Sequence, residues 1–386
     1  MIRHEPVQVY LYQLVHGKKR GPVAAVLLGV LRFMSVVYGL GVDIKLGLYK
    51  AGILKQHKLA CRVISLGNIT VGGTGKTPTA QRLAAIIRDL GYRVVILNRG
   101  YRAKWRGQVG LVSDGRRIYM SVSEAGDEAY LLAKNLPGVA VVIGKNRNVT
   151  GDYAVANLKA DFIILDDGYQ HWQLARDLDI VLIDSINVFG NNFLLPRGTL
   201  REPLTHLNRA DIFLITRVNQ GTDNARDIIR ETLVRYNDQA LVVESVHSPN
   251  CFIEIEDWYK GIRPETVALE AIRGKRVLAF SALGNPTSFE QSISSIGAQI
   301  VDAVRYPDHH DYTMAEMQQV MQRAVDKGVF ALVTTEKDAV KIPSEFIHSD
   351  RPLPLYVLGI EVRFVDNGYQ GLMNLIKSVA ERGGKQ

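Results

Sequence analysis

Short apolar runs rich in β-branched residues recur along the chain after residue 60, with helix-length segments between them. In the first half of the chain these runs are Arg62–Leu66, Arg93–Leu97, Val139–Ile143, Asp161–Leu165, Asp179–Ile183 and Ile212–Thr216. Continuous apolar runs bounded by Gly, Asp or Asn are typical of parallel strands that helices bury on both faces. The pattern therefore predicts an α/β domain built on a parallel sheet.

A second, shorter series of strands and helices follows. Ala240–Ser245 is a further strand candidate, and the irregular stretch Val246–Pro264 after it is expected to connect two domains. Beyond it lie the strand candidates Arg276–Phe280, Gln299–Val304, Phe330–Thr335 and Pro354–Leu358, and a helix over Thr313–Lys327. The predicted organisation is an N-terminal segment (1–58), the first α/β domain (59–245), a connection (246–272) and a smaller α/β domain (273–386).

The N-terminal segment contains one long apolar stretch, Val23–Val42, with Arg32 near its middle. Gly29, Arg32, Ser35 and Gly39 fall within an arc of about 120° on a helical wheel, which indicates weak amphipathicity. Basic residues flank the stretch on both sides, at Lys18, Lys19, Arg20, Lys45, Lys50, Lys55 and Lys58. We expect a hydrophobic helix lying in the cytoplasmic face of a membrane, with a buried first helix and a membrane-spanning helix as the alternatives.

Composition narrows the class of protein. Among 386 residues, 47% are hydrophobic and 22% are charged, which excludes a disordered or fibrous chain. Cys61 and Cys251 are too few for a disulfide framework or a zinc ligand set, so a reducing compartment is expected. The net charge of +8 favours acidic partners: phosphorylated small molecules, nucleic acid or an anionic membrane.

The strand candidate Arg62–Leu66 leads into a glycine-rich loop and then a helical segment. The loop comprises Thr70, Val71, Gly72, Gly73, Thr74, Gly75, Lys76 and Thr77. Its backbone N–H groups and the helix N-terminus form an anion cradle, Lys76 reaches the β- and γ-phosphates, and Thr77 offers its hydroxyl to Mg²⁺. Thr70 stands where the usual pattern opens with Gly, but the Gly-Lys-Thr core still predicts binding of nucleotide phosphates.

Carboxylates follow the strands and begin other elements. Asp166 and Asp167 end an apolar strand, the arrangement that brings an acid to Mg²⁺ beside such a loop, although an exposed turn is the alternative. Asp127 starts a helical stretch and Glu202 follows a loop, and each taken alone is more often a cap or a solvated charge.

The local sequence does not decide the function of two further segments. The stretch 99–106 carries four cations and either clamps an anionic substrate or forms a basic surface loop. The stretch 306–312 contains His309 and His310 between aspartates; it lacks the spacing of a zinc site, and a histidine working with a carboxylate in proton transfer is better motivated.

Together these residues resemble the tetraacyldisaccharide 4′-kinase family of lipid A biosynthesis. The resemblance rests on the loop Gly67–Pro78, Arg99-Gly100-Tyr101, Gly126-Asp127-Glu128, Asp166–His171, Leu195-Pro196 with Gly198, Arg201-Glu202-Pro203, Asp308-His309 and Thr334–Asp338. It implies a P-loop NTPase-like fold of two α/β/α domains joined by a β-ribbon, with the active site in the cleft between them.

The resemblance also implies the reaction and the roles. The γ-phosphoryl group of ATP would pass to the 4′-hydroxyl of a tetraacyldisaccharide 1-phosphate lipid, giving lipid IVA at the inner face of the inner membrane. Asp127 would be the catalytic base, paired with His309, and Thr77, Asp166 and Glu202 would hold Mg²⁺. The cofactors expected are ATP and Mg²⁺, and no obligate protein partner is inferred.

Two rival functions remain at this point. A nucleotide-driven ATPase or chaperone would turn over ATP without any sugar lipid and would not depend on His309. A nucleic-acid-binding protein would use the positive charge on one face and bind with steep salt dependence. The sequence contains no RNA- or DNA-binding motif, so nucleic acid is not expected as a partner.

Overall fold

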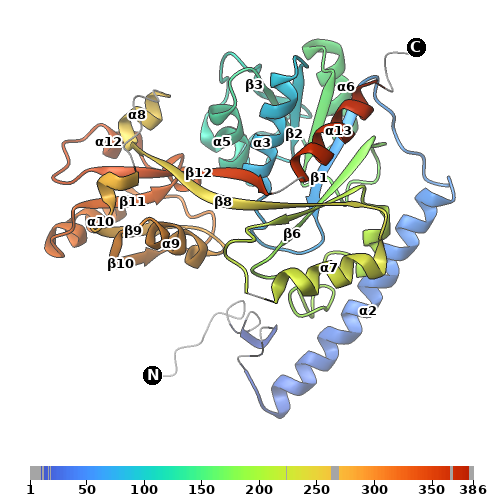
Figure 1. Ribbon diagram of the computed structural model, residues 1–386, viewed down its shortest axis with the longest axis horizontal. Coiled ribbons are helices and arrows are strands. Elements are labelled where there is room, and N and C mark those ends of the chain that lie inside the picture. The colour runs from blue at the N-terminus through green and yellow to red at the C-terminus, as the bar shows by residue number, and fades with distance from the viewer. Residues whose placement is uncertain are drawn as a thin grey trace.

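The computed structural model describes residues 10, 13–15, 17, 19–222, 224–261, 269–365 and 368–381. Its strands form one twelve-stranded sheet in the order β10-β9-β11-β12-β8-β7-β6-β1-β5-β2-β4-β3. Figure 1 shows two lobes on this sheet, with β9, β10 and β11 in one lobe and β1, β2 and β6 in the other. The two lobes are therefore two halves of one continuous sheet.

The first lobe is the predicted α/β domain. Its strands are β1 (Arg62–Asn68), β2 (Val94–Asn98), β3 (Gly110–Ser113), β4 (Ala140–Ile143), β5 (Phe162–Asp166), β6 (Leu178–Asp184) and β7 (Ile212–Thr216). Its helices are α3 (Lys76–Asp89), α4 (Val122–Ala125), α5 (Asp127–Asn135), α6 (Arg147–Leu158), α7 (Ala225–Tyr236) and the 3-10 helix η1 (Leu204–Arg209). All strand pairs among these are parallel except β3 with β4 at the edge, so the carboxyl ends of β1, β2 and β5 meet on one side.

The second lobe is smaller. It contains β9 (Arg276–Ser281), β10 (Gln299–Arg305), β11 (Ala331–Thr335) and the start of β12 (Leu355–Val365). Its helices are α8 (Ile255–Lys260), α9 (Pro286–Ser295), α10 (Met314–Asp326), α11 (Glu336–Ala339), α12 (Ser344–Ile347) and the 3-10 helix η2 (Leu269–Ile272). The last helix, α13 (Gly368–Glu381), returns to the first lobe, where Leu372, Ile376 and Val379 join its core.

A long antiparallel ribbon joins the lobes, and here the structure differs from the expected irregular connection. β8 runs without interruption from Leu241 to Glu254 and pairs with the whole of β12 (Figure 1). Pro249, which lacks a backbone N–H, lies within β8, and the pairing shifts register beside it, between Gly359 and Ile360, as a bulge. The rest of the expected connection continues into α8, and residues 262–268 lie outside the described part of the chain.

The apolar N-terminal stretch forms one helix, α2 (Pro22–Lys50), longer than expected. Half of the predicted polar arc faces the protein: Ser35 is buried and its hydroxyl donates to the Leu194 carbonyl, and Gly39 leaves no room for a Cβ against Leu194, whereas Gly29 and Arg32 are exposed. The opposite side is exposed and apolar, and includes Val26, Val30, Phe33, Val37, Leu40 and Ile44. A buried core helix is therefore not what this segment forms.

Candidate active site

The glycine-rich loop lies between β1 and α3, as the sequence predicts. Lys76 Nζ donates to Asn68 Oδ1 at 3.1 Å and lies 3.5 Å from Asp167 Oδ1. The end of β7 fixes the loop backbone: Thr216 Oγ1 donates to the Thr74 carbonyl at 2.9 Å, and Arg217 donates to the Gly73 carbonyl. The cradle is thus ordered by side chains of the protein itself, with Lys76 directed at the ends of β1 and β5.

Gly75 is a position where only glycine fits. Its φ is +81°, in the left-handed region, and an added Cβ would lie 2.6 Å from the ring of His247. His247 comes from β8 of the ribbon, is buried, and its Nε2 has no hydrogen-bond partner among the described residues. Burial, helped by the charge of Arg217, lowers the pKa of His247 to about 3, so this ring is neutral against the loop.

The two carboxylates after β5 have different environments. Asp166 is buried, and Asn98 Nδ2 at the end of β2 donates to its Oδ2 at 2.7 Å, while its Oδ1 lacks a partner among the described residues. Burial, with the charges of Glu128 and Asp167, raises the pKa of Asp166 to about 7. Burial alone would raise the pKa of Asp167 too, but Lys76 and Arg201 outweigh it and lower that pKa.

Glu202 is not brought to the cavity. It is 0% exposed, and its carboxylate accepts hydrogen bonds from Gln170, from Arg209 and, at 2.9 Å, from His206 Nδ1. The other ring nitrogen of His206 lies 2.8 Å from Asp43 of α2. Glu202 therefore links the apolar helix to the body of the domain, and its predicted metal role would require it to leave these partners.

The two lobes meet through a carboxylate–imidazole pair. Asp127 is the first residue of α5, and its Oδ2 lies 2.7 Å from Nδ1 of His309, which follows β10 in the second lobe. Burial raises the pKa of Asp127, but the hydrogen bond from His309 and the charge of Lys337 outweigh it, so the pKa is lowered. Asp127 is consequently an ionised carboxylate at neutral pH.

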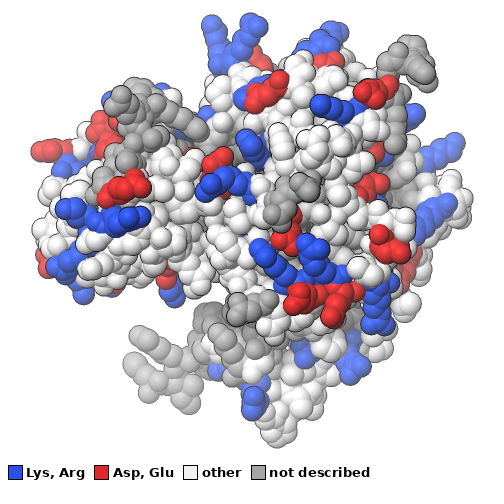
Figure 2. All heavy atoms as spheres, in the orientation of Figure 1, with Lys and Arg blue, Asp and Glu red and all other residues white. Residues whose placement is uncertain are grey.

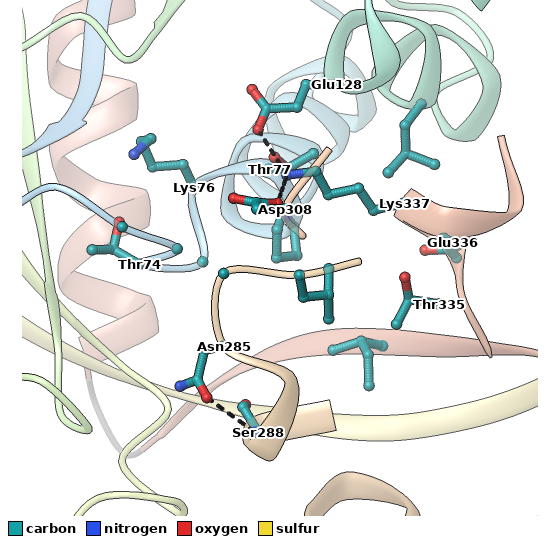
Figure 3. A pocket seen from close by; sticks show the side chains of 18 of the residues that line it. Thr74, Lys76, Thr77, Glu128, Asn285, Ser288, Asp308, Thr335, Glu336 and Lys337 are labelled. Carbon is teal, nitrogen blue, oxygen red and sulfur yellow. Dashed lines mark hydrogen bonds and ion pairs between the residues drawn. The ribbon is translucent and has the colours of Figure 1, made fainter. Parts of the chain in front are cut away.

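A cavity of about 660 Å³ lies between the lobes and collects most of these groups. Residues 72–77, Asp166, Asp167 and His309 line it, whereas Thr70, Val71, Asp127 and Glu202 do not. Asp127 is 7% exposed and contacts His309, which does line the cavity. Figure 3 shows Lys76 and Thr77 on one wall, and Lys337, Thr335 and Asn285 of the second lobe around them.

Some lining residues carried no role in the sequence interpretation. Lys337 belongs to a motif that the family resemblance used, but nothing local indicated what it contacts. Asn285 and Ser288, together with Gln220, meet across the lobes, and Ser288 Oγ donates to Gln220 Oε1 at 2.5 Å. Asn98 could have been predicted from the sequence, because it is a polar residue at the carboxyl end of a predicted strand.

Comparison with known proteins gives the family. The model of the LpxK family, described as tetraacyldisaccharide-1-P 4′-kinase, matches residues 27–379. A tetraacyldisaccharide 4′-kinase of Halothermothrix orenii is 39% identical over 362 residues, covering 92% of this chain and 94% of the relative. The chain belongs to this family. A second relative, from Syntrophus aciditrophicus, is 39% identical over 355 residues, covering 90% and 91%.

A solved structure of LpxK from Aquifex aeolicus, in complex with ATP, matches with a TM-score of 0.70 and 30% identity, covering 92% of this chain and 99% of that one. The predicted family and the P-loop NTPase-like α/β fold are confirmed, as is the class of enzyme: an ATP-dependent kinase of lipid A biosynthesis. The domain boundaries and the roles of individual residues stay predictions.

As in other members of the tetraacyldisaccharide 4′-kinase family, the substrate implied is a lipid disaccharide, and α2 suits such a substrate. It is the one helix among the described residues that is long and apolar enough to cross a membrane. Of the residues in its most hydrophobic stretch, only 17% are buried in the protein. Membrane association follows from this exposed apolar surface together with the lipid pathway.

The residues present fit a divalent cation beside the nucleotide. No group of three His, Cys, Asp or Glu side chains that could hold a metal occurs within the described ranges. Mg²⁺ in kinases is instead held by one or two side chains together with substrate phosphates and water. Asp166, whose buried Oδ1 has no partner among the residues that the structure describes, and Thr77 line the same cavity, and oxygen groups of this kind fit a divalent cation.

Proposed function

We propose that this kinase transfers the γ-phosphoryl group of ATP to the 4′-hydroxyl of tetraacyldisaccharide 1-phosphate, giving lipid IVA, at the cytoplasmic face of the inner membrane. The observation that carries the proposal is the contact of Asp127 in the first lobe with His309 in the second, because His309 lines the same cavity as Lys76. A P-loop enzyme that only hydrolyses ATP has no need of a base supplied jointly by two lobes.

In this proposal each group has one task. Residues 72–77 bind the phosphates of ATP, and Lys76 stabilises the charge that develops on them. Thr77 and Asp166 would hold Mg²⁺, which would supply positive charge against that of the phosphates. The Asp127–His309 pair takes the proton of the sugar hydroxyl as its oxygen attacks phosphorus, and ADP leaves with the electrons of the broken P–O bond.

An anionic lipid as the acceptor accounts for the basic residues of the cavity and for the apolar surface of α2. Arg99, Tyr101 and Arg201 line the cavity and provide cationic and aromatic contacts for an anionic sugar lipid. α2 carries its exposed apolar face away from the protein, which supports insertion into the headgroup region beside the acyl chains. On the face shown in Figure 2, basic side chains lie among acidic ones and form no single stripe of the kind that binds nucleic acid.

The test is label transfer from γ-labelled ATP to purified disaccharide lipid in mixed vesicles. Asp127→Asn keeps the size of the side chain but cannot accept the proton, so kcat is expected to fall by about 10² to 10⁴, with the KM for ATP little changed. Near-normal transfer by Asp127→Asn would reassign the base. ATP hydrolysis at an equal rate with and without lipid would support the ATPase instead.

A further inference from the structure

Lys337 lies in the cleft with three groups around its ammonium. Its Nζ is 3.4 Å from Glu128 Oε1, 3.5 Å from Asp308 Oδ1 and 3.4 Å from His309 Nε2. Glu128 belongs to the first lobe, Asp308 and His309 to the second. Figure 3 shows the amine directed at the two carboxylates, beside Thr77 in the view.

The position of Lys337 is fixed on both sides along the chain. Glu336 accepts hydrogen bonds from Asn135 of the first lobe and from the Trp258 indole. Asp338 is 0% exposed and accepts from the Tyr312 hydroxyl and from a backbone N–H of the second-lobe core. The side chain of Lys337 itself is 21% exposed. A lysine held between two such anchored neighbours is preorganised and is not a mobile surface charge.

The contact with His309 has a definite chemical consequence. An ammonium has only donors, so at 3.4 Å from Nε2 it requires that nitrogen to be the acceptor. The proton of a neutral imidazole then lies on Nδ1, where it is donated to Asp127 at 2.7 Å. A second proton on His309 would also place two like charges in contact.

We propose that Lys337 is a positioning residue for phosphoryl transfer: it holds His309 neutral with its proton on Nδ1, so that the ring orients Asp127 as the proton acceptor. The inference rests on the proposed role of the Asp127–His309 pair. During transfer the hydroxyl O–H bond breaks, its proton passes to Asp127, and Lys337 keeps its own protons.

Of the other charged groups facing this cluster, Asp308 Oδ2 lies 3.8 Å from His309 Nε2, beyond hydrogen-bond distance, and the rest agree with the assignment. Burial lowers the pKa of Lys337, but Glu128, Asp308 and Asp127 outweigh it, and the pKa is raised, so the ammonium persists at neutral pH. The charge of Lys337 in turn helps to lower the pKa of Asp127, and Lys341 adds to the same effect. Arg102 contacts only the carbonyl of His309, at 2.7 Å, and Tyr101 packs against the ring.

The experiment compares Lys337→Met and Lys337→Arg with Lys327→Met, which removes an exposed lysine of the same lobe. For Lys337→Met we expect kcat to fall by about tenfold to a hundredfold with the KM for ATP within about twofold, and the acid limb of the pH–rate profile to move upward. Lys337→Arg is expected to keep the acid limb near the wild-type position, and Lys327→Met to match wild type.

A second readout covers a loss of activity caused by misfolding. In the ¹⁵N spectrum of histidine-labelled protein, wild-type His309 should appear protonated on Nδ1, and the signal of that tautomer should weaken in Lys337→Met. An unchanged tautomer, or an unchanged acid limb with a KM for ATP raised tenfold or more, overturns the inference; the second result would make Lys337 a nucleotide contact.

The same assay separates the two claims. If Asp127→Asn is inactive while Lys337→Met behaves as wild type, only the role of Lys337 is refuted. If Asp127→Asn is active, the proposed base itself fails. Under the proposal, adding Lys337→Met to Asp127→Asn lowers kcat no further, because the lysine acts through the carboxylate.

Discussion

Asp166 offers a test in which removing a charged site residue should stabilise the nucleotide-free protein. The carboxyl is buried, one of its oxygens has no partner among the described residues, and its pKa is raised from 3.8 to about 7. A rise of that size corresponds to about 4 kcal/mol between the protonated and ionised forms. Because the unfolded chain releases this proton near pH 4 and the folded protein near pH 7, stability is lost as pH rises across that window.

Asp166→Asn removes the ionisation and keeps the size of the side chain. The amide oxygen can still accept from Asn98, as the carboxylate does at 2.7 Å. We expect the variant to be about 2 to 4 kcal/mol more stable than wild type at about pH 8, and its stability to vary less between about pH 5 and about pH 8. Urea unfolding without nucleotide or Mg²⁺ measures both quantities, and kinase activity should be lost.

Asp167→Asn is the matched control with the opposite sign. Lys76 and Arg201 hold the pKa of Asp167 below its ordinary value, so its contribution to stability is present above about pH 4 and is lost as pH falls. Its side chain is 40% exposed, so solvent screens these pairs and the loss at neutral pH should be at most about 1 kcal/mol. If Asp166→Asn is as unstable as Asp167→Asn at about pH 8, Asp166 is ionised and well paired, and the reasoning is wrong.

Three further predictions follow from other contacts. Lys76→Ala should lower kcat by about 10² to 10³ in the label-transfer assay, since Lys76 acts on the phosphates, and should cost at most about 1 kcal/mol of stability through its loss from Asp167. Phe33→Glu with Val37→Glu should weaken binding to anionic vesicles by about tenfold or more in sedimentation, because both side chains are exposed on α2; Val234→Glu, at an equally exposed site on α7, should leave it unchanged. Asp338→Asn should lower stability to heat by about 3 kcal/mol, since it leaves the buried Lys341 without its carboxylate at 2.9 Å; unchanged melting would contradict this.

The parts of the fold that depend on local pattern were predicted well from sequence. The strand candidate Ile212–Thr216 is β7 as observed, and the glycine loop stands between a strand and a helix, because apolar runs and glycines encode local conformation. The local pattern missed the continuous β8, although the family resemblance implied a β-ribbon between the domains, because a strand spanning two lobes is stabilised by its partner β12, which lies about a hundred residues away in sequence.

The residues of the site also fall into those that local sequence predicted and those that it did not. Lys76 was found from the Gly-Lys-Thr motif of the loop, and Asp166 from its position after a strand, because parallel strands present their carboxyl ends together. The enclosure of Glu202 by Arg209 and His206, and the contacts of Lys337, come from side chains brought together by tertiary folding and have no local signature. The pairing of Asp127 with His309 came from the family resemblance, since no spacing rule joins residues 182 apart.

The enclosure of Glu202 has a consequence for how the apolar helix relates to the cavity. Tyr38 of α2 donates to the carbonyl of Arg201 at 2.8 Å, and Asp43 of α2 contacts His206, which holds Glu202. Arg201 itself lines the cavity and pairs with Asp167 at 2.8 Å. The same short segment therefore contacts the helix on one side and the phosphate-loop carboxylates on the other. The apolar helix is thus tied directly to a wall of the cavity, through the backbone of Arg201 and through His206.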